Sequence, residues 1–323
     1  MQAWQVPDFG KPPKRVEIVT PTPAKGEIVV RVEAVGLNFA DMLAIQGKYQ
    51  VRQTPPFVPG MEFSGVVEAL GPGVEGPTPG TSVLATCPAG ALAERISLPA
   101  HRLTPFPAAM GFEEAAGFPI AYGTSHLALT HMARLKPGET LFVTGAAGGV
   151  GLTAVEIGKR LGARVIASAR GEARLAVARE AGADVLIDSD APGLKDALRA
   201  EGGVDVVYDV VGGPAFDQAL RACKPDGRLL AIGFASGEVP QVAANLLLVK
   251  NLTVSGFWYG GYESHAPQLA SDSMTRLLGW RAEGLIRPHV SHVLPFDAFP
   301  EGLALLRDRK ATGKVVIRVG QEP

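Results

Sequence analysis

The sequence predicts an α/β protein with two domains, one rich in β-strands and one built on a doubly wound parallel sheet. Its 323 residues are enough for two domains. About the first 110 residues hold short strand-like segments separated by glycine and proline, as in small barrels. From about residue 112, strand-like segments alternate with helical patterns, which predicts parallel strands joined by right-handed crossovers.

The strand-like segments of the first domain are short and rich in β-branched residues. Glycine- and proline-rich turns at 71–73 and 76–80 separate some of them. The strands are expected at 16–19, 27–35, 63–70, 82–86 and 93–98.

The second domain begins after a largely helical segment at 112–135. Its strands are expected at 140–144, 163–169, 185–188, 204–211, 228–233 and 252–257. The intervening helices are expected at 149–161, 172–181, 193–200, 214–222 and 244–250.

The elements after residue 260 do not extend this parallel sheet simply. They read as a helix at 268–283, a strand at 290–295, a helix at 299–309 and a strand at 314–319. We expect them to return to the first domain, which makes that domain discontinuous. The expected domains are therefore 1–119 with 257–323, and 120–256.

The glycine turn after the strand at 140–144 indicates a dinucleotide site. It reads Gly145-Ala-Ala-Gly-Gly-Val-Gly151, with Ala146 in the first glycine position of the usual fingerprint. Glycine lets the backbone approach a ligand, and the start of the next helix offers unpaired N–H groups to a pyrophosphate. The residues expected to bind it are Ala147, Gly148, Gly149 and Val150.

The end of the second strand of this domain favours NADPH over NADH. An acidic residue there would bond the ribose hydroxyls and repel a 2′-phosphate. The strand ends Ala167-Ser168-Ala169, followed by Arg170 and, one helical turn later, Arg174. A hydroxyl and two guanidinium groups suit a phosphate, although both arginines could instead be solvated surface charges.

Composition excludes several classes of partner. With 31 basic and 32 acidic residues, the chain shows no charge excess for nucleic acid or a membrane surface. No apolar run is long enough for a membrane span, and the start lacks a signal-peptide pattern. Two distant cysteines favour a reducing compartment, so we expect a cytoplasmic protein. Scarce Asn and abundant Pro and Arg fit a thermophile or a GC-rich genome.

Several stretches together resemble a known family. They are Ala34-Val-Gly-Leu-Asn-Phe-Ala-Asp41, Gly47-Lys-Tyr49, Pro59-Gly-Met-Glu-Phe-Ser-Gly-Val-Val67, Gly123-Thr-Ser-His-Leu-Ala-Leu129, Ala146-Ala-Gly-Gly-Val-Gly151 and Ala311-Thr-Gly-Lys-Val-Val316. Their order and spacing resemble the quinone oxidoreductase (zeta-crystallin-like) branch of the medium-chain dehydrogenase/reductase superfamily. The resemblance covers essentially the whole chain.

This resemblance implies a fold and an assembly. It implies a GroES-like catalytic domain made from both chain ends, a central Rossmann domain, and NADPH in the cleft between them. It also implies a homodimer formed by pairing the edges of two Rossmann sheets, with 252–257 as the edge strand. An exposed apolar edge needs covering, so such pairing makes physical sense.

No metal is expected. The zinc alcohol dehydrogenases of this superfamily hold Cys where this chain has Asn38, and His where it has Met61. The six histidines show no zinc-ligand spacing, and two cysteines cannot supply a structural zinc site alone.

The resemblance also assigns catalytic residues. Asn38 would lie near the nicotinamide ribose, although it could be a plain turn residue. Asp41 would help orient the site, although it could simply be an acidic residue at a helix start. Tyr49 would lie over the active site, or else pack on the barrel.

Further cofactor contacts are expected from both domains. Thr124 would reach the nicotinamide from a helix start, with a plain N-cap as the alternative. The remaining candidates lie at strand ends or match family positions. They are Ser189 for the adenine ribose, Gly233 and Phe234, Phe257 and Trp258, of which Phe257 could be core, and Lys314.

The expected reaction is hydride transfer from NADPH to a quinone without a metal. A quinone needs no strong Lewis acid, because its reduced form is a delocalised oxyanion. The nearest alternative is an NADPH-dependent enoyl or alkene reductase of the same superfamily. Another is a non-catalytic NADPH-binding or RNA-binding protein, although the chain lacks a basic aromatic patch for RNA.

Overall fold

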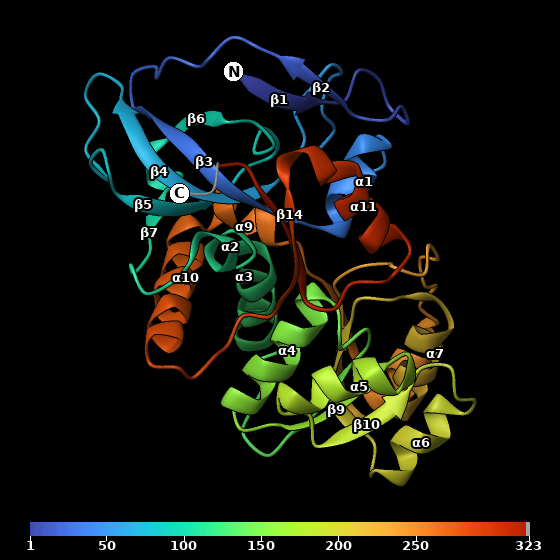
Figure 1. Ribbon diagram of the computed structural model, residues 1–323. Coiled ribbons are helices and arrows are strands. Elements are labelled where there is room, and N and C mark those ends of the chain that lie inside the picture. Colours follow the sequence, from blue (N-terminus) through green and yellow to red (C-terminus); the bar gives the residue numbers. More distant parts are fainter. Residues whose placement is uncertain (321–323) are drawn as a thin grey trace. The chain divides into compact units, whose positions relative to one another are not determined.

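The structure is a computed structural model that describes residues 1–320, arranged in two compact units (Figure 1). The β-rich unit comprises Met1–Ile120 together with the chain from Pro288 onward. The parallel-sheet unit comprises Ala121–Arg287. The β-rich unit is thus built from both ends of the chain.

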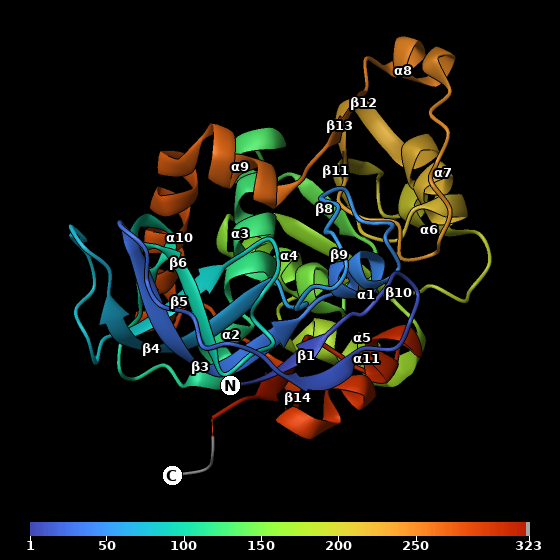
Figure 2. The ribbon, with the colours of Figure 1, turned by 90° about the horizontal axis from the view of Figure 1, so that it is seen from above.

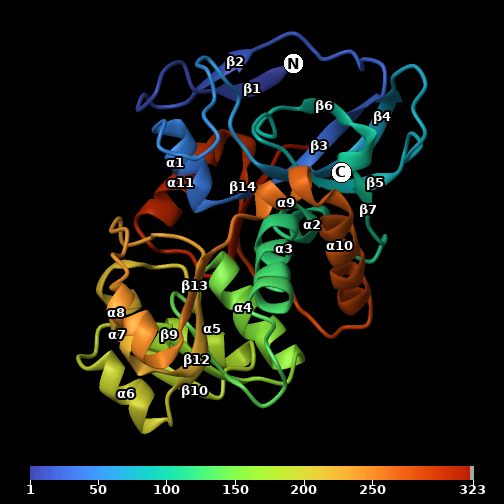
Figure 3. The same ribbon diagram turned by 180° about the vertical axis from the view of Figure 1, so that it is seen from behind.

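The second boundary between the units differs from the expected one. The first lies one residue from the expected position, but the second falls at Pro288 rather than at 257. Two helices fill the difference, α9 (Tyr259–His265) and α10 (Pro267–Ala282). Helix α10 lies beside α3 (Pro119–Leu127), where His126 Nδ1 and Ser273 Oγ are 2.7 Å apart (Figure 3). This long-range packing, which the local sequence pattern does not encode, holds 259–287 in the parallel-sheet unit.

The β-rich unit has a seven-strand sheet in the order β14-β15-β3-β4-β5-β7 with β6 on β3, and a separate antiparallel pair, β1 with β2. The strands are β1 (Gln2–Gln5), β2 (Lys14–Glu17), β3 (Glu27–Leu37), β4 (Glu62–Leu70), β5 (Ser82–Thr86), β6 (Arg95–Pro99), β7 (Thr104–Pro105), β14 (Val290–Pro295) and β15 (Lys314–Arg318). Strand β3 carries β4 along one edge, and β6 and β15 share the other. Strand β15, near the end of the described chain, therefore lies inside this sheet, between β14 and β3.

Short helices accompany this sheet. They are α1 (Phe39–Ile45), α2 (Phe112–Ala116), α11 (Phe299–Arg307), and single turns at Ala100–Arg102 and Phe296–Ala298. The apolar core includes Ile28, Leu37, Phe63, Leu92 and Phe299, all at most 1% exposed. Alternating apolar residues on β3 and β4 supply much of it, as the strand pattern predicts.

The parallel-sheet unit confirms the expected doubly wound fold. Its six strands lie in the order β10-β9-β8-β11-β12-β13, and every pairing is parallel. They are β8 (Thr140–Val143), β9 (Arg164–Ala169), β10 (Val185–Asp188), β11 (Val204–Asp209), β12 (Cys223–Ala231) and β13 (Thr253–Gly256). The strand order reverses between β8 and β11, because β9 and β10 lie on one side of β8 and β11 lies on the other. In doubly wound sheets, ligands bind at this switch point, outside the carboxyl ends of the strands.

Helices connect these strands. They are α4 (Gly149–Arg160), α5 (Gly171–Glu180), α6 (Leu194–Ala200), α7 (Gly213–Ala222) and α8 (Ala244–Lys250), and a π-type turn at Ala128–Met132 follows α3. Figure 2 shows α8 beside β12, at the end of the sheet where β13 forms the edge. Across residues 1–320, no helix combines the length and apolar character that crossing a bilayer demands.

Candidate functional site

The glycine turn brings the start of α4 against the end of β8. Gly145 has a left-handed φ of +59°, and a Cβ there would lie 2.6 Å from Val210 Cγ2. A Cβ on Gly151 would lie 2.2 Å from the Gly145 carbonyl oxygen, so only glycine permits this close approach. The first N–H groups of α4 have no acceptor within the helix and are available to an anion.

Ala146 replaces a glycine without strain. Its φ lies outside the left-handed region, and its N–H donates to the Ser168 carbonyl oxygen at 2.9 Å. Gly148 is exposed and caps α4, and its own N–H donates to Gly145 O at 2.9 Å. This leaves the N–H groups of Gly149 and Val150 as the best placed for a pyrophosphate.

A buried hydrogen-bond network lies beneath this turn, where the carboxyl ends of β8 and β11 meet. Thr144 Oγ1 donates to Asp209 Oδ1 at 2.5 Å and accepts from the Val210 N–H at 3.0 Å. The other carboxylate oxygen accepts from the Gly212 N–H at 2.8 Å. Burial raises the pKa of Asp209, against the lowering effect of these donors. The network ties the ends of β8 and β11 together. The sequence signal for it was an acidic residue directly after an apolar strand.

A second network holds α3 against α4. Ser125 Oγ lies 2.9 Å from Tyr208 Oη and 2.7 Å from Thr153 Oγ1, and it donates to Val150 O at 2.9 Å. Thr124, the neighbouring residue, lies inside α3 and is 6% exposed. It is therefore neither at a helix start nor an N-cap, because the helix begins five residues earlier. Its contact with the nicotinamide stays a prediction.

The end of β9 presents arginine where an acidic residue would select NADH. Ser168 and Ala169 are almost fully buried at the strand end, whereas Arg170 is exposed and caps α5. Arg170 Nε donates to Asp190 Oδ1 at 3.0 Å, and both side chains are more than half exposed. Such a surface pair is weak, so a phosphate can compete for the guanidinium group. Arg174 follows one turn later in α5, and Ser189 is exposed after β10.

The aromatic candidates separate into exposed and buried side chains. Phe234 and Trp258 are 37% and 43% exposed, and Gly233 precedes Phe234 after the end of β12. Phe257 is 7% exposed and stacks on Tyr262, with the ring centroids 5.1 Å apart. Phe257 is thus packed in the interior, the alternative that the sequence left open, whereas Phe234 and Trp258 are exposed.

In the β-rich unit, Asn38 and Asp41 lie at the start of α1. Asn38 is the N-cap, and its backbone N–H donates to Asp41 Oδ2 at 2.8 Å. Asp41 is completely buried, and burial raises its pKa to about 7. Among the described residues, its Oδ1 has no hydrogen-bond partner. Asp41 thus lies in the first turn of a helix, and its role in orienting the site stays a prediction.

Lys314 lies in a buried ion pair with Glu62, a residue that sequence reasoning did not single out. Its Nζ donates to Glu62 Oε1 at 2.7 Å, to Asn38 Oδ1 at 2.7 Å and to Leu37 O at 2.8 Å. An ammonium group has three hydrogens, and all three are used here. The contact between Lys314 and the cofactor stays a prediction. The sequence signal for Glu62 was a carboxylate at the head of an apolar strand.

Tyr49 lies in the loop after α1 and is half-buried. Its place over an active site stays a prediction. Within residues 1–320, no three His, Cys, Asp or Glu side chains gather as a metal site requires.

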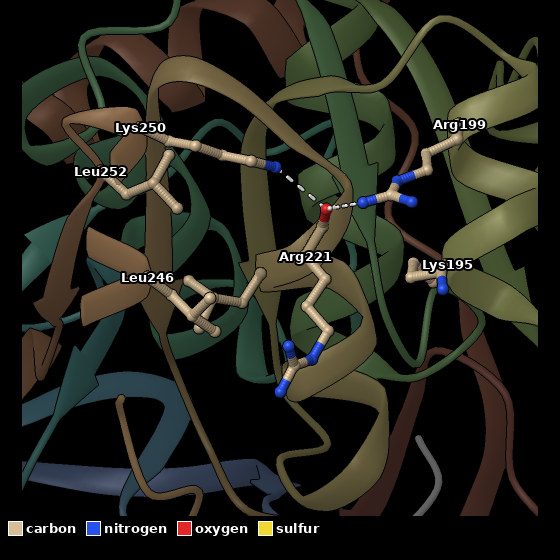
Figure 4. Close-up of a pocket in the computed structure, with 7 residues that line it drawn as sticks. Lys195, Arg199, Arg221, Leu246, Lys250 and Leu252 are labelled. Atoms are coloured by element: carbon tan, nitrogen blue, oxygen red, sulfur yellow. Dashed lines mark hydrogen bonds between the residues drawn. The ribbon is translucent and has the colours of Figure 1, made fainter. Parts of the chain in front are cut away.

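A small pocket lies away from these residues, at the amino ends of β12 and β13 (Figure 4). Its volume is about 180 Å³, and Lys195, Arg199, Leu220, Arg221, Leu246, Lys250 and Leu252 line it. Arg199 and Lys250 both donate to the Arg221 carbonyl oxygen, at 3.2 and 3.0 Å. Cations at the end of α7 are stabilised by its dipole and its free carbonyls, which accounts for this cluster.

A GroES-like β-rich unit and a Rossmann unit with a glycine turn define a dehydrogenase/reductase of the medium-chain class. Residues 24–108 match the alcohol dehydrogenase GroES-like domain, and residues 149–276 match the zinc-binding dehydrogenase family. The quinone oxidoreductase-like protein 2 homolog of Nematostella vectensis is 39% identical over 301 residues, which cover 91% of this chain and 82% of that protein. The chain belongs to the quinone oxidoreductase branch of the medium-chain dehydrogenase/reductase superfamily.

Solved structures agree with this assignment. The quinone oxidoreductase from Thermus thermophilus, solved also in complex with NADPH, is 36% identical with a TM-score of 0.87. The match covers 99% of this chain and all of that one. The Escherichia coli quinone oxidoreductase complexed with NADPH is 27% identical with a TM-score of 0.92, over 99% of this chain and 100% of its own.

Proposed function

We propose that this protein is an NADPH-dependent quinone reductase that works without a metal. The observation that carries the proposal is the pair of side chains at the positions where zinc dehydrogenases of this superfamily hold ligands. Asn38 is bonded to Lys314 and Glu62, and Met61 is 6% exposed. An amide and a thioether suit an acceptor that needs no Lewis acid, as a quinone does.

The described residues fit NADPH. The close approach at Gly151 opens the start of α4 to a pyrophosphate, and the exposed Arg170 suits a 2′-phosphate. The NADPH complexes of the Thermus thermophilus and Escherichia coli enzymes support the same cofactor. When bound, NADPH supplies a hydride.

The chain's own residues bind, orient and desolvate in this proposal. The N–H groups of Gly149 and Val150 bind the pyrophosphate, and Arg170 with Arg174 binds the 2′-phosphate. Asn38 holds the reacting end, where an amide can accept from a ribose hydroxyl without adding charge. The exposed rings of Phe234 and Trp258 cover the reacting groups. The reduced acceptor takes its proton from water or a nearby hydroxyl.

The test is a steady-state screen of NADPH oxidation. Benzoquinones and naphthoquinones are compared with 2-enoyl thioesters, each with NADPH and with NADH. We expect turnover of quinones with a preference for NADPH. Turnover of enoyl thioesters alone would assign an enoyl reductase instead, and NADPH binding without any turnover would contradict the enzymatic function.

We also propose a homodimer through the edge of the parallel sheet. Strand β13 is the last strand of the sheet, and among residues 1–320 one of its edges pairs with no other strand. Nearby, Val242, Leu248 and Val249 are 38%, 79% and 72% exposed. Pairing two copies of β13 would satisfy the free backbone groups of that edge.

A further inference from the structure

We propose that Lys314 and Glu62 form a positioning pair that fixes the amide of Asn38, so that Lys314 affects the reaction through Asn38 and not through the cofactor. This inference rests on the proposed function, in which Asn38 lies at the reacting end of NADPH. It concerns three side chains from three strands or strand ends: Asn38 after β3, Glu62 on β4 and Lys314 on β15.

The chemistry of the two charged groups sets the orientation of the amide. Lys314 Nζ can only donate, so the Asn38 oxygen, 2.7 Å away, must face it. The ionised Glu62 carboxylate can only accept, so the Asn38 Nδ2, 2.9 Å from Oε1, must face that. A flipped amide would place an N–H against the ammonium group and an oxygen against the carboxylate. The pair therefore permits one orientation only.

The pair is fully bonded before any ligand binds. Glu62 is completely buried, and its second oxygen accepts from the Ile120 N–H at 2.8 Å. Lys314 is 7% exposed, and its third hydrogen goes to Leu37 O. Neither charged group has to move or exchange a partner when the cofactor arrives, so both are pre-organised.

Two glycines leave room for these side chains. A Cβ on Gly36 of β3 would lie 2.7 Å from Glu62 Oε1 and 2.4 Å from the Ala116 carbonyl oxygen. A Cβ on Gly117 would lie 3.1 Å from both Cβ and Cγ of Lys314. The backbone is thus shaped around the pair at both of its ends.

Asn38 keeps bonding capacity for a ligand after these contacts. Its oxygen has a second lone pair, and the second hydrogen of Nδ2 reaches only Gly36 O, at 3.4 Å. The side chain is half-buried. With the amide locked, the second lone pair of its oxygen and the weakly bonded N–H each have a defined direction, which suits one ligand geometry.

A double-mutant cycle tests the inference. The charge-neutral change Glu62→Gln with Lys314→Met removes the pair, and Asn38→Ala removes its target. NADPH dissociation constants come from the quenching of protein fluorescence, and kcat/KM from quinone reduction. We expect each change alone to lower kcat/KM by about 10- to 100-fold, as for other contacts that orient a site residue. The triple variant should be no worse than Asn38→Ala.

A direct contact between Lys314 and the cofactor gives the opposite result. The losses would then multiply, and removing the pair would weaken NADPH binding as much in the Asn38→Ala protein as in the wild type. That outcome overturns the inference. The cycle of NADPH dissociation constants needs no turnover. It therefore still tests whether Lys314 contacts the cofactor if the wild-type protein reduces no quinone. Absence of quinone reduction would contradict only the proposed function.

A second ion pair on the same strand supplies the matched control. Arg318 of β15 donates to Glu113 at 2.9 Å, and both side chains are about one third exposed. Arg318→Met with Glu113→Gln should leave kcat/KM and NADPH affinity within about twofold of the wild type, as expected for a surface pair. If the Glu62→Gln/Lys314→Met protein does not fold, Glu62→Gln alone, made with and without Asn38→Ala, repeats the cycle with a nearly isosteric change.

Discussion

Asp41 is a buried carboxyl group whose protonation is coupled to folding. Burial is the largest cause of its pKa of about 7, with the Asn38 N–H and Lys314 opposing and Glu62 adding to the rise. Its ordinary value is 3.8, so between pH 4 and 7 the folded chain binds a proton that the unfolded chain has lost. Stability is therefore expected to fall as pH rises through this range.

Asp41→Asn removes the titration while keeping an oxygen acceptor for the Asn38 N–H. Relative to the wild type, this variant should gain up to about 4 kcal/mol on going from pH 4 to above pH 7, at 1.36 kcal/mol per pKa unit. Urea unfolding at pH 4.5 and pH 8 measures the difference. An equal difference at the two pH values would mean that Asp41 does not titrate in this range.

We predict that the two arginines after β9 determine the preference for NADPH over NADH. Changing Arg170 and Arg174 together to Ala should raise the NADPH dissociation constant by about 10- to 100-fold, because charge-assisted bonds to a phosphate are lost. NADH has no 2′-phosphate, so its dissociation constant should stay nearly unchanged. Fluorescence titration with both cofactors measures this, and parallel losses for NADPH and NADH would remove the basis for the specificity.

The contacts of a residue were hardest to predict where its partners lie far away in the sequence. The cofactor contact predicted for Lys314 comes from the family resemblance, and nothing near Lys314 in the chain reveals its bond to Glu62, 252 positions earlier. The position of Arg170 directly after β9 could be predicted, because the strand is a compact apolar run, and its contact with the cofactor stays a prediction. Phe257 stayed undecided because its burial depends on stacking with Tyr262.

At the scale of elements, the two glycines that flank the start of α4 make a matched pair. A Cβ on Gly151 would lie 2.2 Å from the Gly145 carbonyl oxygen, whereas one on Gly148 would lie at an ordinary 3.4 Å. Gly151→Ala should therefore lower the free energy of unfolding by about 1–3 kcal/mol, as for an overpacked site. Gly148→Ala should lower the free energy of unfolding by clearly less. Thermal and urea unfolding of both variants compare them, and equal losses would contradict the steric explanation.

The parallel strands could be predicted because each is a compact apolar run. Strands β8, β9 and β10 begin and end within one residue of the expected positions. Helix α9 was not among the expected helices, and α1 entered only through the alternative that Asp41 stands at a helix start. Strand β12 begins at Cys223, earlier than expected, where Lys-Pro-Asp-Gly interrupts the apolar pattern.

At the scale of the whole molecule, the proposed dimer predicts a mass in solution. Light scattering after gel filtration should give twice the 33.7 kDa of one chain. The free edge of β13 and the exposed side chains beside it are the surface that a second copy would cover. A mass of one chain across the micromolar range would contradict the pairing.

The place of β15 in the sheet has a consequence for how the protein is made. Strand β15 lies between β14 and β3, and it carries the lysine that neutralises Glu62. During translation, the first 120 residues and the whole of the parallel-sheet unit leave the ribosome before that strand exists. Until then β3 has an open edge beyond Arg31 and Glu62 lacks its cation. Synthesis must therefore reach β15 before Lys314 can bond Asn38 and Glu62, so the amide of Asn38 can be set in place only late in translation.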